Sequence, residues 1–211
     1  MDPSTSSQAE IPEGNIAELF LEAVDTHKKP DALKYKKDGA WYNISHDELY
    51  AEVKRAALGL AALGVGPGDR VAILSENRPE WVITDFACVL LGAITAPFYP
   101  VLPADQVGYL LRDSESKAIF VSTEEQLQKI RELRDDAPSL KHVVSYDPPG
   151  EGEPGVISFE KLLELGQNAV GEISDDEYRA RGLATDPHDM LTIIYTSGTT
   201  GRPKGAMLTH N

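Results

Sequence analysis

The sequence predicts an α/β fold: a mostly parallel sheet with helices on both faces, preceded by a β-hairpin. Three observations predict it. From Arg70 onward, short apolar runs typical of buried strands alternate with stretches of helical periodicity. Turns rich in glycine and proline separate these stretches. Two β-prone runs flank Asp38-Gly39, a dipeptide that strongly favours a hairpin turn.

Composition limits the class of protein and its partners. The 211 residues, 41% hydrophobic and 26% charged, suffice for one large domain or two small ones. The formal net charge of −14 argues against nucleic acid and anionic membranes as partners through bulk electrostatics. The single cysteine, Cys88, lies in an apolar helical pattern, which fits a buried thiol and a reducing, cytoplasmic location. Neither a signal peptide nor a transmembrane run is predicted.

The N-terminal elements follow from caps and turns. Residues 1–14 are polar and contain two prolines, so we expect them to be disordered. A helix is predicted from Asn15, a good capping residue, because apolar residues recur at helical spacing after it. Ser45 and Glu48 have the spacing of a capping box before a second helix, which we expect Gly64 to end.

From Arg70 onward, predicted strands alternate with predicted helices. Because strand–helix–strand crossovers are right-handed and join parallel strands, the strands should form one sheet. Two more capping boxes are predicted, at 122–125 and 174–177. His, Cys and carboxylate residues nowhere have metal-ligand spacing. Strands are predicted at 70–74, 94–98, 118–121 and 140–145. Helices are predicted from an opening at 76–80 to a stop at Gly92, from 103, after 125, at 159–165 and from 174 to about 182.

One stretch near the C-terminus carries recognisable chemistry: Tyr-Thr-Ser-Gly-Thr-Thr-Gly-Arg-Pro-Lys-Gly, residues 195–205. Apolar runs on both sides indicate that a strand leads into this loop and that regular structure resumes after it. Glycines allow close backbone approach and positive φ, and successive N–H groups in such turns bind anions. Hydroxyls and a lysine add donors and positive charge. The candidate phosphate-binding residues are Thr196, Ser197, Gly198, Thr199, Thr200, Gly201, Lys204 and Gly205.

The loop differs from two familiar phosphate-binding patterns. In the P-loop a glycine directly precedes the lysine, whereas two residues separate Gly201 from Lys204. The dinucleotide motif requires a glycine two positions before Gly198, where Thr196 stands. The alternative without ligand chemistry is a flexible surface loop, but flexible linkers are usually Gly/Ser mixtures without a Pro-Lys-Gly exit.

The eleven residues of this loop resemble the phosphate-binding signature of the AMP-forming, adenylate-forming enzymes. These are the acyl-CoA synthetases, the luciferases and the adenylation domains of nonribosomal peptide synthetases. The resemblance extends over most of residues 15–211 and is strongest to the long-chain fatty acyl-CoA synthetases. It implies that residues 15–211 are the N-terminal portion of an AMP-binding domain, truncated just after the phosphate-binding loop.

The resemblance also implies a reaction with ATP, Mg²⁺, a fatty acid and coenzyme A. A carboxylate attacks the α-phosphorus of ATP and releases pyrophosphate, and a thiol then takes the acyl group from the adenylate. Residues 196–201 would cradle the β- and γ-phosphates, Lys204 would act as the catalytic cation on phosphate oxygens, and the Thr196 hydroxyl would reach Mg²⁺.

Much of the family's machinery lies downstream of this loop, including the adenine pocket, the acidic Mg²⁺ ligand and the C-terminal domain. We therefore expect the 211-residue chain alone to be inactive, and its truncated face to favour self-association. Two alternatives remain. The chain could come from the amino-acid adenylation domain of a peptide synthetase, or it could be a non-catalytic α/β module that binds anions.

Overall fold

A seven-stranded sheet organises the chain, as a computed structural model shows for residues 14–150, 154–196 and 202–211. The strand order is β7-β6-β5-β3-β4-β8-β9. All pairings from β7 to β8 are parallel, and β9 pairs with β8 antiparallel, which confirms the predicted mostly parallel sheet. Its strands are β3 (Arg70–Leu74), β4 (Ile94–Phe98), β5 (Ala118–Val121), β6 (His142–Ser145), β7 (Val156–Ser158), β8 (Met190–Thr196) and β9 (Lys204–Thr209).

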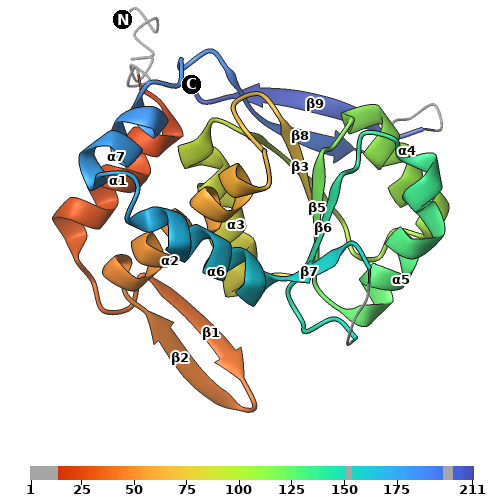
Figure 1. Ribbon diagram of the computed structural model, residues 1–211, viewed down its shortest axis with the longest axis horizontal. Helices are drawn as coiled ribbons and strands as arrows, with labels where there is room; N and C mark the ends of the chain where they lie inside the picture. The colour runs from red at the N-terminus through yellow and green to blue at the C-terminus, as the bar shows by residue number, and fades with distance from the viewer. Residues whose placement is uncertain (1–13, 151–153, 197–201) are drawn as a thin grey trace, which may run out of the picture.

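Helices cover both faces of the sheet (Figure 1). The chain moves from β3 to β4 in one direction and then returns past β3 to β5. Right-handed crossovers therefore place α3 and α4 on opposite faces. One layer contains α1 (Ile16–His27), α2 (His46–Ala62), α3 (Pro79–Leu91), α6 (Phe159–Val170) and α7 (Asp175–Leu183), and the other contains α4 (Ala104–Ser114) and α5 (Glu124–Leu133), followed by a short 3₁₀ turn, Arg134–Asp136.

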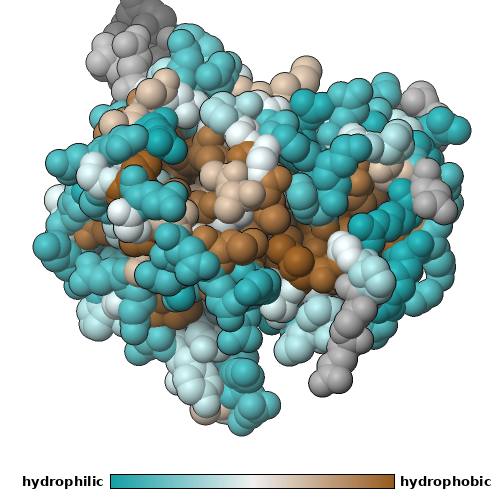
Figure 2. Space-filling view, viewed as in Figure 1, coloured by the Kyte–Doolittle hydropathy of each residue, from teal (hydrophilic) through white to brown (hydrophobic). Residues whose placement is uncertain are grey.

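The two layers enclose separate apolar cores. Along β3, Val71 and Ile73 face the larger layer, while Ala72 and Leu74 face α4 and α5. All four side chains are fully buried, as expected for a central strand covered on both sides. In Figure 2 apolar residues show through between the two layers, whose outer surfaces are hydrophilic.

The predicted hairpin is confirmed and forms a separate two-stranded sheet of β1 (Leu33–Lys37) and β2 (Ala40–Ile44). Asp38 and Gly39 both have positive φ, 50° and 81°, which is the signature of the type I′ turn that matches strand twist. At the base of the hairpin, Leu33 and Ile44 pack on the larger core. The rest extends beyond the body (Figure 1).

Caps explain most of the helix starts, with two corrections. The Ser45–Glu48 capping box is present in full. Of the box predicted at 174–177 only one half forms, in which the Ser174 side chain accepts from the Glu177 amide. The box predicted at 122–125 is wrong, because α5 begins after Thr123 and no side chain caps it. The Ser122 amide instead donates to the Leu74 carbonyl, so this residue remains part of the sheet edge.

Helix α6 is longer than the 159–165 that the sequence predicts, because Gly166 does not end it. Gly166 lies against α2, where a Cβ atom would come within 1.8 Å of the Arg55 carbonyl oxygen. On the facing helix, a Cβ at Gly59 would lie 2.3 Å from the Leu162 oxygen. The two glycines thus allow the helix backbones to approach closely. Strand β7, only three residues long, was not predicted.

The two described ends of the chain meet. Asn15 caps α1 as predicted, and its side-chain amide also donates to the Thr185 carbonyl at 2.8 Å. The Ile16 amide donates to Nδ1 of buried His210 at 3.3 Å. Except for Gly14, the disorder expected for residues 1–14 concerns residues outside the described structure. Cys88 is buried, as predicted, and none of the described helices has the length and apolarity to span a membrane.

Candidate active site

The candidate site lies at the carboxyl ends of β3, β4 and β8. The segment after β3 leads to one face of the sheet and the segment after β4 leads to the other, so the two diverge. Such a divergence opens a crevice outside the strand ends, where open α/β sheets bind their ligands. Strand β8 lies beside β4 and brings the predicted phosphate loop to the same edge.

Two pockets open at this edge. One, of about 470 Å³, lies between the ends of β3 and β4. The other, of about 320 Å³, lies on the side of α4. It reaches both limbs of the loop, which are the end of β8 (Tyr195 and Thr196) and residues 202–205. Both are lined by Pro97, Phe98, Tyr99 and Tyr195. The larger pocket adds Ser75, Glu76, Asn77, Trp81, Pro100, Val101 and Ile194, and the smaller adds Leu102, Gln106, Leu110, Thr196 and Pro203.

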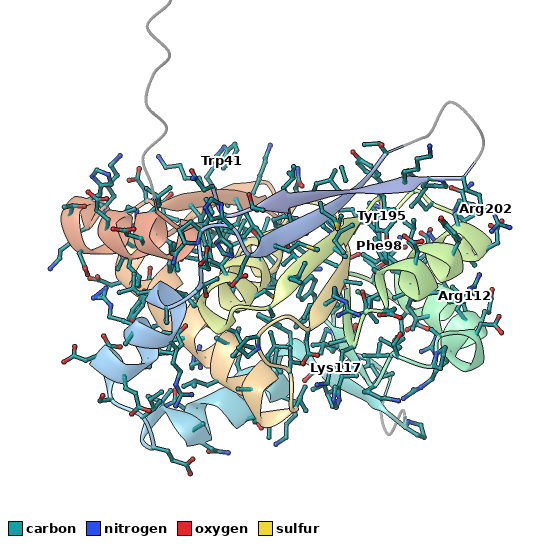
Figure 3. All side chains as sticks on the ribbon, turned by 90° about the horizontal axis from the view of Figure 1, so that it is seen from above. Trp41, Phe98, Arg112, Lys117, Tyr195 and Arg202 are labelled. Carbon is teal, nitrogen blue, oxygen red and sulfur yellow. The ribbon has the colours of Figure 1, made fainter. Side chains whose placement is uncertain are left out.

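Phe98 and Tyr195 line both pockets, and their side chains lie next to each other (Figure 3); we call this shared lining the wall. Their rings meet edge to face, with centroids 5.8 Å apart and an interplanar angle of 73°. The Tyr195 hydroxyl donates to the Asp113 carboxylate on α4 at 2.8 Å. Burial, and then this hydrogen bond, raise the pKa of Tyr195, so it remains a neutral donor.

The limbs of the loop lie side by side. Thr196 ends β8 and pairs with Lys204, which begins β9 as predicted, so regular structure does resume at the lysine. Lys204 is exposed. The residues between them that were assigned to the phosphate site, Ser197, Gly198, Thr199, Thr200 and Gly201, lie outside the described residues.

Gly205 lacks the positive φ that a glycine in this loop could adopt, and its contact with phosphate stays a prediction. Gly205 belongs to β9 and pairs with Tyr195 of β8. A Cβ atom there would lie 2.7 Å from Cγ2 of Ile193 and 3.3 Å from Cε1 of Tyr195. Glycine is therefore required because the neighbouring side chains of β8 fill the space above it.

Helix α4 holds both limbs of the loop. Asp113 binds the Tyr195 hydroxyl on the first limb, and the Tyr109 hydroxyl donates to the Pro203 carbonyl on the second at 3.2 Å. The Arg202 guanidinium lies over the Tyr109 ring, 5.4 Å from its centroid. The sequence analysis missed this support, although the four-residue spacing of Tyr109 and Asp113 places them on one helix face.

A second support fixes the end of β3. Arg78 precedes α3 and donates to Glu80 at 2.8 Å, to Asp147 at 3.0 Å and to the Ser122 carbonyl at 3.2 Å. These contacts join the segments that follow β3, β5 and β6. The segment after β3, which lines the larger pocket, is therefore fixed to the segments that follow β5 and β6.

The described residues fit part of a magnesium–nucleotide site. Among them, no group of three His, Cys, Asp or Glu side chains could hold a metal ion. The Thr196 hydroxyl is a hard oxygen donor of the type that Mg²⁺ accepts beside phosphate oxygens. This chain could therefore supply one oxygen ligand and the Lys204 charge, while phosphates supply further ligands.

The architecture defines a doubly wound α/β protein with a ligand crevice at the carboxyl edge of its sheet. The chain belongs to the AMP-binding enzyme family, whose model matches residues 20–211. It is 37% identical over 201 residues to the long-chain-fatty-acid–CoA ligase FadD15 of Mycobacterium bovis and 34% identical over 197 residues to the ligase ACSBG1 of Rattus norvegicus. Each match covers 93% of this chain but only 31% and 27% of the relatives.

Solved structures agree with this assignment. The anthranilate–CoA ligase AuaEII, determined with anthranoyl-AMP, superimposes with a TM-score of 0.77 at 27% identity, over 95% of this chain and 36% of that one. A putative long-chain-fatty-acid–CoA ligase from Rhodopseudomonas palustris gives 0.71 at 25% identity, over 94% of this chain and 45% of that one. The predicted family and fold are thereby confirmed.

Proposed function

We propose that this chain is the N-terminal, phosphate-binding part of an AMP-forming long-chain fatty acid–CoA ligase. The observation that carries the proposal is the family match across residues 20–211, together with 37% identity to a ligase of that class. In the proposed reaction, a carboxylate oxygen attacks the α-phosphorus of ATP and pyrophosphate leaves. The thiol of coenzyme A then attacks the acyl carbon, and AMP leaves.

The chain's own residues contribute charge and position. Negative charge accumulates on the leaving pyrophosphate, and donors fixed in advance stabilise it without reorganising. We assign this role to residues 196–201 and to Gly205, with Lys204 as the cation that meets phosphate oxygens. Bound Mg²⁺ supplies further positive charge, and the Thr196 hydroxyl is the ligand that this chain offers. Tyr109 and Asp113 keep both limbs in place.

The chain by itself should form no acyl-CoA, since it spans about a third of its relatives. We place the ligase in the cytoplasm, where a buried, unpaired cysteine is stable. The antiparallel strand β9 exposes Met207 (68%) and Leu208 (50%), and we propose this surface as the site of self-association.

Binding of ATP·Mg²⁺ to the chain, measured by isothermal titration, tests the phosphate site. Lys204→Ala should weaken binding roughly tenfold or more, because a charged hydrogen bond contributes about 1.5–3 kcal/mol. Lys141→Ala is the matched control, since that exposed lysine donates to the Pro138 carbonyl elsewhere on the surface and should not matter. No binding by the intact chain, or equal loss in both variants, would count against the site.

Carboxylate-dependent ATP–pyrophosphate exchange tests the reaction in a protein that extends this chain to the length of its relatives. Exchange stimulated by long-chain fatty acids, followed by acyl-CoA formation, is the expected result. Stimulation by amino acids alone would favour the peptide synthetase alternative. Binding of ATP without any exchange would favour the non-catalytic module.

A further inference from the structure

The β1–β2 hairpin has a charge opposite to that of the rest of the chain. Residues 28–44 contain five lysines against two aspartates, although the whole chain carries −14. A quarter of the chain's 20 basic residues thus fall within this short stretch, and all of these lysines are exposed. The bulk argument against an anionic membrane therefore does not apply to this part of the surface.

The hairpin also carries an exposed aromatic face. Cross-strand register places Lys36 opposite Trp41 and Lys34 opposite Asn43, so these four side chains share one face. The other face includes Leu33 and Ile44, which pack on the core, and the stacked rings of Tyr35 and Tyr42. The Lys–Trp face does not pack on the core. On it Lys34 forms an ion pair with Asp31 at 2.8 Å, and Trp41 is 70% exposed at the rim of the molecule (Figure 3).

We propose that this hairpin docks on the surface of an anionic phospholipid membrane. Tryptophan prefers the boundary between water and lipid, because its ring is apolar while its N–H is polar. Each lysine near an anionic leaflet strengthens binding by roughly fivefold. Lys36 lies directly opposite Trp41, so its charge and the ring act together, while Asp31 offsets part of the Lys34 charge on the same face. This inference concerns a surface outside the candidate active site and does not rest on the proposed reaction.

The acidic body does not cancel the attraction. Each strand of the hairpin has five residues and is therefore about 17 Å long. Charges in physiological salt are screened over about 8 Å. The tip of the hairpin, which extends beyond the body, thus meets a membrane largely independently of the body's negative charge (Figure 1).

A lipid surface fits this face better than nucleic acid does. Proteins that bind single strands combine several stacking aromatics with arginine. Residues 28–44 contain no arginine, and the Lys–Trp face carries one large aromatic. Lysine ammonium groups are compact point charges that suit diffuse attraction to a layer of headgroups.

Vesicle binding by the 211-residue chain tests the proposal. It should bind vesicles of phosphatidylcholine with phosphatidylserine, bind phosphatidylcholine alone much more weakly, and detach at high salt. Charge reversal by Lys34→Glu with Lys36→Glu should weaken binding at least roughly 25-fold, and Trp41→Ala should weaken it severalfold. With Trp81→Phe as background, Trp41 fluorescence should shift to the blue on binding.

Two matched variants sharpen the test. Asp38→Asn keeps a residue suited to the type I′ turn and removes the acidic charge at the tip, so binding should tighten. Lys141→Glu should have no effect, because the Lys141 amide binds the carbonyl of Lys117, which lies on the opposite side from Trp41 (Figure 3). Equal effects of Lys141→Glu and Lys36→Glu would overturn the proposal. So would capture of a single-stranded oligonucleotide but not of vesicles, or a dimer that Trp41→Ala dissociates.

Discussion

At the scale of single residues, Tyr109 is a positioning residue for the candidate phosphate loop. Its hydroxyl group binds the Pro203 carbonyl, and its ring lies beneath the Arg202 guanidinium. Neither contact touches a substrate. This side chain nevertheless attaches the second limb of the loop to α4.

Tyr109→Phe should loosen the second limb without unfolding the chain. Loss of one hydrogen bond costs about 1 kcal/mol, so local opening should increase roughly fivefold. Trypsin cleavage between Lys204 and Gly205 measures this opening. Tyr42→Phe is the control, because it removes a hydroxyl from the exposed hairpin and retains the ring that stacks on Tyr35. Equal cleavage rates for natural protein and Tyr109→Phe would show that the contact positions nothing.

At the scale of elements, the crossing of α2 and α6 depends on the absence of two side chains. Gly166→Ala would place a methyl group against the Arg55 carbonyl, and the helices would have to separate. Overpacking of this kind costs about 1–3 kcal/mol. The free energy of unfolding, measured with urea, should therefore fall by that amount.

Gly171→Ala is the matched control, because it lies just beyond the end of α6. Gly171 has right-handed φ and ψ, −77° and −12°, and a Cβ atom there would meet nothing within 4 Å. Alanine at this site should leave stability unchanged or raise it by up to about 1 kcal/mol. Similar losses in both variants would mean that glycine content, and not helix approach, determines the effect.

Elements with strong local signals could be predicted from the sequence. Strands 70–74, 94–98 and 118–121 match the structure, as do the hairpin turn and the Ser45–Glu48 box. The length of α6 could not be predicted, because Gly166 is a local stop signal that tertiary packing overrides. Strand β7 was missed because three residues are too short to show periodicity.

The same distinction applies to the candidate site. The loop could be found because glycines, hydroxyls and a lysine are adjacent in the sequence. The support from Tyr109 and Asp113 could not, since it is 82 to 94 residues away along the chain. Gly205 was assigned to phosphate binding, and only the β8–β9 register reveals the side chains above it.

At the scale of the whole molecule, His210 joins the two described ends of the chain. Burial lowers the pKa of His210, while the charge of Asp189 opposes that shift. The neutral imidazole accepts a hydrogen bond from the Ile16 amide, which an imidazolium cannot do at Nδ1. Protonation therefore breaks the contact.

This contact should make stability depend on pH. The unfolded chain binds the proton near pH 6.5 and the folded chain only at lower pH, so the contribution is fully present above 6.5 and is lost below it. His210→Gln removes the titration and keeps a side chain that can accept. The difference in urea midpoint between the natural protein and this variant should therefore shrink or reverse from about pH 8 to about pH 5. Parallel midpoints at every pH would contradict the assignment.

The wall of Phe98 and Tyr195 has a kinetic consequence. Because Phe98 and Tyr195 line both pockets, a shift of their side chains toward one pocket narrows that pocket and widens the other. A ligand bound in one pocket would therefore change the affinity of the other pocket, although the two ligands do not touch. An inhibitor that fills the smaller pocket should therefore change the apparent affinity for a ligand in the larger one, a mixed pattern of inhibition rather than simple competition.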